Sequence, residues 1–223
     1  PDTVENCLDW IDVAQKITDS AAHDQHTAPL LSIAMAVISP LFINAYNITI
    51  MRLAIESGYP ILSTGCPMAG ATSPFSVMGT FVQANCEALL PVLITQLFKS
   101  GHPVLYGMGP SITDMRTGTD QYYRIEKMLF KVMANQMGQY YQLPTSGEAG
   151  GSLTHLYDMQ NGAESMSFLL ASLTGGQNII GGLGSLGNAN GMSSEQIIMQ
   201  CALVDMAGYL SRGISMEELV SGT

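Results

Sequence analysis

The sequence predicts an α/β fold, a (β/α)8 TIM-type barrel of which this chain supplies about the C-terminal five βα units. After about residue 29, one module recurs five times: a short apolar run ends in glycine, proline or small polar residues, and an amphipathic helix follows. Strands that alternate with helices of this length pair in parallel through right-handed crossovers. In such a barrel the loops after the strands carry the chemistry.

The first two units lie between residues 33 and 99. The apolar run 33–38 precedes a helix near 46–57, and the run 59–62 leads through glycines into a helix at about 81–99. Pro91 removes a backbone donor inside that second helix, so a kink is expected there. Helical period places one apolar stripe on it, formed by Val82, Cys86, Leu89, Leu90, Leu93 and Leu97.

Three further units follow. The run 102–105 precedes a helix at about 124–142, the run 142–145 precedes a glycine loop and a helix from near Gly162, and the run 178–180 precedes a helix at 194–212. The 124–142 helix has the cleaner stripe, formed by Ile125, Met128, Leu129, Val132, Met133, Met137 and Tyr140. Ser193 and Gln196 predict a capping box at the start of the last helix, and Gly213 predicts its end.

Composition indicates one domain, or most of one, over residues 1–223. Hydrophobic residues make up 47% of the 223, enough for a sizeable core. A complete barrel needs roughly 250 residues and the chain begins with proline, so we expect the C-terminal part of a longer protein. Residues 1–27 are more polar and predict an outer helix and a loop.

Charge, cysteine spacing and the length of apolar stretches argue against several classes of protein. The net charge is −10 and the eight Lys and Arg are widely spread, which argues against nucleic acid as a partner. The four cysteines show neither zinc-site nor disulfide spacing, so no metal site is expected. The longest apolar stretch, 28–43, is interrupted and too short to span a membrane. With no charged leader visible, a cytoplasmic protein is expected.

Five motifs occur in a fixed order along the chain. They are Ser39-Pro40-Leu41, the run PMAGATSP from Pro67 to Pro74, Gln83-Ala84-Asn85-Cys86-Glu87, Asp114-Met115-Arg116-Thr117-Gly118, and Asp158, Gln160, Gly162 and Glu164 in D-x-Q-x-G-x-E spacing. In order and spacing, from about Pro29 to Ile214, the chain resembles the trimethylamine methyltransferase superfamily. That family's fold is a β/α barrel, and its full members are about twice this length.

The resemblance implies transfer of a methyl group from a methylated amine to the cobalt of a corrinoid carried by a separate small protein. Members that use trimethylamine carry pyrrolysine. In the corresponding stretch, 147–158, this chain has Leu153 and His155 where an acidic residue and a lysine stand in those members. The chain therefore resembles the non-pyrrolysine branch, which demethylates quaternary amines such as glycine betaine, proline betaine or carnitine.

The reaction sets clear demands on the protein. A quaternary nitrogen already bears the charge that makes a tertiary amine leave, so no general acid is needed. The nucleophile, Co(I), belongs to the corrinoid, and the barrel holds the cation with one methyl group in line. Aromatic faces and one or two carboxylates suit the onium group, and a donor suits a betaine carboxylate.

Candidate substrate-binding residues lie after the predicted strands. Tyr106 either lines the pocket or packs at the rim. At least one of Tyr122 and Tyr123 is expected to pack on the outside of the barrel. We take Tyr123 as the one that contacts the substrate. Glu148 lies among glycines that let backbone approach a ligand closely. His155, in the same loop, either binds a substrate carboxylate or has a structural role.

Three charged residues complete the substrate set. Asp114 and Arg116 could bind the two ends of a zwitterion, although a structural ion pair is the commoner outcome. Asp158 matches the family signature but also suits a helix cap, as does Glu164.

The run from Gly181 to Gly187 contains G-x-G-x-x-G at Gly182, Gly184 and Gly187. A dinucleotide loop is weakly supported, because the helix begins several residues later. We expect instead a flexible loop at the barrel mouth, including Asn190, where a corrinoid approaches; plain backbone bending is the alternative.

The sequence leaves two other functions open. One is an enzyme of unrelated chemistry on the same fold, such as a lyase. The other is a betaine-binding barrel that has lost catalysis. A homo-oligomer is expected in each case.

Overall fold

The computed structural model describes residues 3–20 and 31–214 of the chain. The helices are α1 (Val4–Ser20), α2 (Ala45–Glu56), α3 (Val77–Phe98), α4 (Ile125–Tyr141), α5 (Met159–Thr174) and α6 (Ser194–Arg212). The strands at the centre are β1 (Ile33–Val37), β2 (Ile61–Gly65), β4 (Val104–Leu105), β7 (Ser146–Glu148) and β8 (Ile179–Gly181). Short strands in the loops are β3 (Met68–Ala69), β5 (Ser111–Thr113), β6 (Asp120–Gln121), β9 (Ser185–Leu186) and β10 (Gly191–Met192).

Five central strands lie side by side in chain order, all parallel. β1 pairs with β2, β2 pairs with β4, and β7 pairs with β8. A parallel bridge between Tyr106 and Thr145 joins the two groups, with the Ser146 amide donating to the Tyr106 carbonyl at 2.9 Å. The sequential order of parallel βα units is therefore as predicted.

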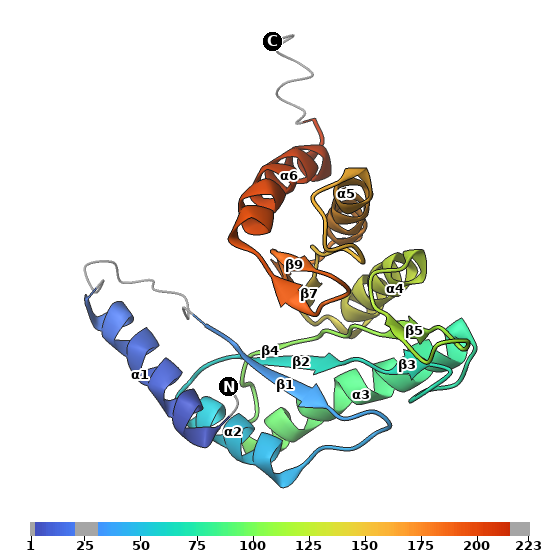
Figure 1. The fold of residues 1–223 in the computed structure, drawn as a ribbon. Coiled ribbons are helices and arrows are strands. Elements are labelled where there is room, and N and C mark those ends of the chain that lie inside the picture. Colours follow the sequence, from blue (N-terminus) through green and yellow to red (C-terminus); the bar gives the residue numbers. More distant parts are fainter. Residues whose placement is uncertain (1–2, 21–30, 215–223) are drawn as a thin grey trace.

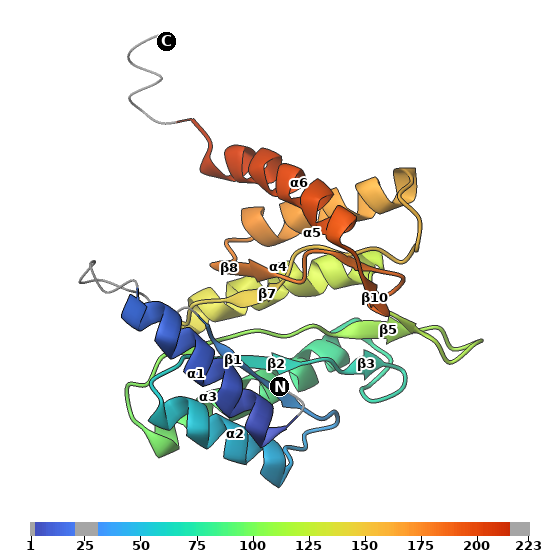
Figure 2. The ribbon, with the colours of Figure 1, turned by 60° about the vertical axis from the view of Figure 1, so that its left-hand side comes forward.

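The helices α2 to α6 follow one another around the outside of the strands in an arc (Figure 1). Figure 2 shows the same arc from another side, with α5 and α6 over β7 and β8. Among residues 3–20 and 31–214, no pairing joins β1 to β8. Closure into eight units thus stays a prediction.

Helix ends match the prediction more closely than strands do. α6 covers 194–212 as expected, with Ser193 Oγ accepting from the Gln196 amide and Gly213 ending the helix at φ +65°. The prediction for β7 was wrong: the strand is 146–148, not 142–145. Gln142 ends α4 in a left-handed conformation, and Leu143 still donates to Gly138, so pairing starts later.

The apolar stripe of α3 does not face the core. Val82, Leu93 and Leu97 are exposed, and the buried face instead carries Phe81, Ala84, Glu87 and Ala88. Apolar residues occur on all sides of α3, so the helical periodicity of the sequence could not show which side is buried. The helix passes through Pro91 without a break. By length and composition α3 alone among the described helices could cross a membrane, but it packs along β2.

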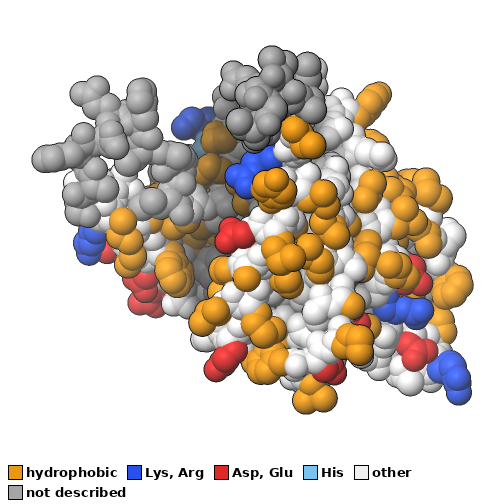
Figure 3. Space-filling view, turned by 90° about the horizontal axis from the view of Figure 1, so that it is seen from above, with side chains coloured by type: hydrophobic (Ala, Val, Ile, Leu, Met, Phe, Trp, Pro, Cys, Tyr) orange, Lys and Arg blue, Asp and Glu red, His pale blue; other side chains and the backbone are white. Residues whose placement is uncertain are grey.

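Exposed apolar side chains continue onto the outer helices. Ile125, Leu129 and Tyr140, all from the predicted stripe of α4, are exposed. Figure 3 looks down on α5 and α6, which are uppermost in Figure 1, and hydrophobic side chains are spread across this face. The buried face of α4 includes Lys127 and Lys131. Both lysines belong to the candidate site described below.

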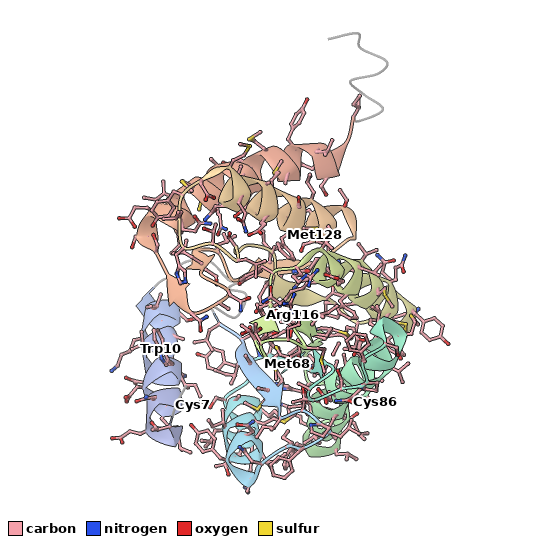
Figure 4. The ribbon with its side chains drawn as sticks, turned by 45° about the vertical axis from the view of Figure 1, so that its right-hand side comes forward. Cys7, Trp10, Met68, Cys86, Arg116 and Met128 are labelled. Carbon is pink, nitrogen blue, oxygen red and sulfur yellow. The ribbon has the colours of Figure 1, made fainter. Side chains whose placement is uncertain are left out.

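The N-terminal helix covers one open end of the core. In α1, Cys7 is fully buried and packs with Ile50 and Met51, whereas Trp10 is 60% exposed (Figure 4). The helix α1, Val4–Ser20, lies within residues 1–27, where an outer helix was predicted. The loop predicted after it lies outside the described residues.

Candidate functional site

A cavity of about 190 Å³ lies between the parallel strands and the loops that follow them. Its wall includes Ser63 from β2, Gly107 after β4, Ser146 and Glu148 from β7, and Gly182 after β8. Residues from each of the five parallel strands, or from the loop that follows it, thus line one cavity.

Glu148 is the centre of a charged cluster at this edge. Tyr122 donates a hydrogen bond to Glu148 Oε1, and Lys127 Nζ lies 3.0 Å from Glu148 Oε2. The Lys127 ammonium also lies over the Tyr122 ring. Cys66 Sγ, after β2, is 3.7 Å from the Tyr122 hydroxyl. About a third of the Glu148 side-chain surface remains accessible, and it faces the cavity.

A second lysine lies behind the same strand. Lys131 is 3% exposed, and its Nζ has no hydrogen-bond partner in the described part of the chain. A Cβ built on Gly147 would lie 2.7 Å from that Nζ. The end of the Lys131 side chain therefore packs closely against the strand at Gly147.

Burial and charge shift the pKa values of these groups. Burial alone would raise the pKa of Glu148, but the ammonium groups of Lys127 and Lys131 lower it to about 2. Burial lowers the pKa of Lys127 against the opposing effect of Glu148. Burial likewise lowers the pKa of Lys131, to about 8. Burial raises the pKa values of Tyr122 and Cys66. At neutral pH, Glu148 is therefore ionised and Tyr122 is a hydrogen-bond donor.

A second cavity, of about 440 Å³, adjoins the first at Glu148. Four residues that the sequence analysis selected lie in its wall: Tyr123, Glu148, Gly182 and Asn190. The Tyr123 hydroxyl donates to Ser185 Oγ at 2.9 Å, and its ring is edge-on to Tyr122 and Phe168. An aromatic ring, a carboxylate and the glycine-rich loop thus share one cavity.

Tyr106 lies elsewhere than expected. It is fully buried, donates to Asn85 Oδ1 of α3 at 2.6 Å and packs edge-on to Tyr141. Its ring fills the layer between β4 and the helices, because side chains alternate between the two faces of a strand. Tyr106 is therefore a core residue and does not line either of these cavities.

Asp114 and Arg116 belong to the β5–β6 turn. Asp114 accepts from the Arg116 amide at 2.9 Å and from Thr117 Oγ1 at 3.0 Å. Arg116, labelled in Figure 4, is exposed and forms no ion pair with Asp114. The pair shapes a turn and is not brought to either cavity.

The remaining acidic candidates fix the loop before α5. Asp158 caps α5, accepting from the Asn161 amide at 3.0 Å. Glu164 is not a cap: it accepts from Ser152 Oγ at 2.6 Å and the Leu153 amide at 2.8 Å. These two carboxylates of the family signature hold the loop between Glu148 and α5.

The predicted corrinoid loop is built around three glycines with positive φ. Gly182, Gly184 and Gly187 have φ of 72°, 91° and 59°. The exposed His155 ring fills the space where Gly187 would carry a Cβ, so His155 supports the loop and does not line the two cavities. Asn190 Nδ2 donates to the Gly187 carbonyl at 2.9 Å.

Glu87, which the sequence analysis recorded only as part of a motif, is a fully buried carboxylate. It accepts from Ser39 Oγ at 2.6 Å, the Leu41 amide at 3.1 Å and Gln83 Nε2 at 2.9 Å. Two motifs that are far apart in the sequence therefore form one network behind the strand ends.

Sequence reasoning missed Lys127, Lys131 and Cys66. The available signal was a pair of lysines four residues apart on one helix, in a chain with only eight Lys and Arg. The other six basic residues are exposed. Residues four apart lie on the same helix face, so both lysines had to be inside or both outside. No group of three or more His, Cys, Asp or Glu able to hold a metal occurs in residues 3–20 and 31–214.

Known proteins match this chain over most of its length. Glycine betaine methyltransferase of Desulfitobacterium hafniense (strain Y51) is 29% identical over 191 residues, which is 85% of this chain and 40% of that protein. Proline betaine:corrinoid methyltransferase of Eubacterium limosum is 26% identical over 198 residues, 88% of this chain and 41% of that protein. Trimethylamine methyltransferase MttB of Methanosarcina thermophila is 25% identical over 214 residues, 96% of this chain and 44% of that protein.

The chain thus spans about two fifths of the length of these relatives. The model of the family described as trimethylamine methyltransferase (MTTB) matches residues 3–222. The chain belongs to the trimethylamine methyltransferase family.

Proposed function

We propose that this protein transfers a methyl group from a betaine-type quaternary amine to the Co(I) corrinoid of a partner protein. The observation that carries the proposal is that the Tyr123 ring and the Glu148 carboxylate line one cavity with the loop at 182–192. An aromatic face and an ionised carboxylate are the groups that attract an onium ion. Relatives named for glycine betaine and proline betaine support this substrate class.

The residues of this chain bind and orient the substrate. Glu148 stays ionised at neutral pH and faces the cavity, and Tyr123 is fixed by its hydrogen bond to Ser185. No group has to protonate the leaving amine, because the quaternary nitrogen departs as a neutral tertiary amine. The high pKa of Tyr122 agrees with a purely binding role for the cluster.

The loop at 182–192 suits the approach of a large flat cofactor. A Cβ built on Gly191 would meet nothing within 4 Å, and backbone and small side chains form much of this wall of the cavity. Gly182 and Asn190 would be the residues that contact the corrinoid. When bound, the corrinoid supplies the nucleophile that accepts the methyl group. A cytoplasmic homo-oligomer that meets a small corrinoid protein completes the proposal.

The test is formation of methylcobalamin from cob(I)alamin and glycine betaine. We expect methyl transfer with the protein, and a loss of at least about tenfold in kcat/KM with Glu148→Gln, because a neutral amide gives up the charge attraction. Trimethylamine should be a poor donor. Arg52→Gln, an exposed change in α2, is the matched control and should retain the rate of the unchanged protein.

The other two functions give different results in the same experiment. A non-catalytic barrel would bind glycine betaine without producing methylcobalamin. An enzyme of unrelated chemistry would neither bind the betaine nor methylate the corrinoid. Either result would contradict the proposed activity.

A further inference from the structure

Glu148 is the carboxylate that acts on two buried ammonium groups. Lys127 and Lys131 are both buried on the inner face of α4, and Glu148 is the carboxylate beside them. Asp120 of β6 contributes a weaker attraction to Lys127. Tyr122, Tyr123 and Cys66 are the other titratable groups packed on the cluster, and all three stay neutral at pH 7 because burial raises their pKa values.

The two lysines are not equivalent. Lys127 Nζ forms an ion pair with Glu148 at 3.0 Å, whereas no ion pair of Lys131 is found among the described residues. Lys131 Nζ packs against Gly147, whose backbone lines the smaller cavity. A buried ammonium without an ion pair is costly, which favours its neutral form.

A bound onium ion would add a further positive charge on the cavity side of Glu148. Like charges near one carboxylate repel each other, strongly so where water is excluded. The quaternary nitrogen has no proton to lose, and Lys127 is held by its ion pair. Lys131 has no ion pair to lose, so loss of its proton is the way to reduce the repulsion that breaks no ion pair.

We propose that binding of a quaternary ammonium ion beside Glu148 displaces one proton from Lys131, so that this buried lysine sets the pH range in which the site accepts its cation. The inference rests on the proposed onium site and adds a coupled proton to it. The pKa of Lys131 lies near 8, so affinity should rise through that pH and level off above it.

The experiment is calorimetric titration of the protein with tetramethylammonium chloride and with glycine betaine between pH 6.5 and 8.5. Buffers of different ionisation enthalpy report the protons released. We expect release of up to one proton at pH 7, and affinity that rises severalfold, at most about tenfold, per pH unit below pH 8. Release at pH 7 should exceed release at pH 8.5.

Two variants test whether the released proton comes from Lys131. Lys131→Met replaces an unpaired buried ammonium with an apolar chain of similar size, so it should fold, bind the cation at every pH and release no proton. Lys99→Met, an exposed lysine at the end of α3, is the control and should behave as the unchanged protein.

Two results would overturn the inference while leaving the onium site intact. One is cation binding without proton release or pH dependence. The other is a pH dependence that persists in Lys131→Met, which would move the proton to another group. Absence of binding by either cation at any pH would overturn the onium site itself, and the proton coupling with it.

Discussion

The Lys127 ammonium lies 3.0 Å from the Glu148 carboxylate, and both come from positions that face the strand ends. Glu148 ends the strand β7, and Lys127 is in the first turn of α4. The pair links the helix layer to the wall of the cavity. Its charge balance governs the stability of this region and, under the proposed function, the affinity of the cavity for a cation.

Replacing Glu148 by Gln should destabilise the protein by about 3–5 kcal/mol at pH 7, because two buried ammonium groups lose their carboxylate. The folded pKa of Glu148 is lowered to about 2 from 4.5. Its contribution is therefore present above about pH 4.5 and lost as pH falls toward 2. Urea unfolding of both proteins between pH 3 and 7 measures this, and an equal pH dependence in both would contradict the ion pair.

Lys131→Met should stabilise the protein by about 1–3 kcal/mol at pH 7, because an unpaired ammonium is no longer buried. The folded pKa of Lys131, about 8, is below its unfolded value of 10.5. Stability of the unchanged protein therefore rises with pH between these values, and the advantage of the variant should shrink over the same interval. Thermal unfolding at pH 7 and 9.5 tests this, with Lys99→Met as the control.

Tyr123 should contribute to cation binding through its ring and not its hydroxyl. Tyr123→Phe keeps the ring and loses only the hydrogen bond to Ser185, so affinity for tetramethylammonium should change little. Tyr123→Leu should weaken binding by about 0.5–2 kcal/mol. Affinity is measured by calorimetry. Equal effects of the two changes would show that the Tyr123 ring does not contribute to cation binding.

Gly151 holds the Tyr123 ring in place by having no side chain. Its φ is +124°, and a Cβ there would overlap the ring. Gly151→Ala should cost about 1–3 kcal/mol in the free energy of unfolding and weaken cation binding. Gly208→Ala in α6, where a Cβ meets nothing within 4 Å, should instead stabilise by about 0.5–1 kcal/mol.

Two substitutions of the buried residue Glu87 should differ in how much they destabilise the protein. Three donors reach its carboxylate. Glu87→Ala should destabilise by about 2–4 kcal/mol, because buried donors lose their acceptor. Glu87→Gln should cost less, because the Ser39 hydroxyl can rotate to accept from the new amide. Unfolding by denaturant ranks the two, and a reversed order would contradict these hydrogen bonds.

Part of the site could be predicted from the sequence because local pattern places loops after strands. Glu148, Tyr123, Gly182 and Asn190 were selected in this way and share one cavity. Tyr106 was selected by the same argument, yet it points to the helices. One step along a strand reverses the direction of a side chain, and the sequence did not show which face Tyr106 occupies after β4, although the end of that strand at Leu105 was predicted correctly.

The sequence by itself determined the alternation of strands and helices, the bounds of α6, and the family motifs, because these depend on residues that are neighbours in the chain. Only the tertiary structure decided which face of α3 and α4 is buried and which groups surround Glu148. Tyr122 is 26 residues from Glu148, and Cys66 is 56 residues from Tyr122. Contacts over such separations follow from strand pairing and helix packing, which place groups together that no local pattern connects.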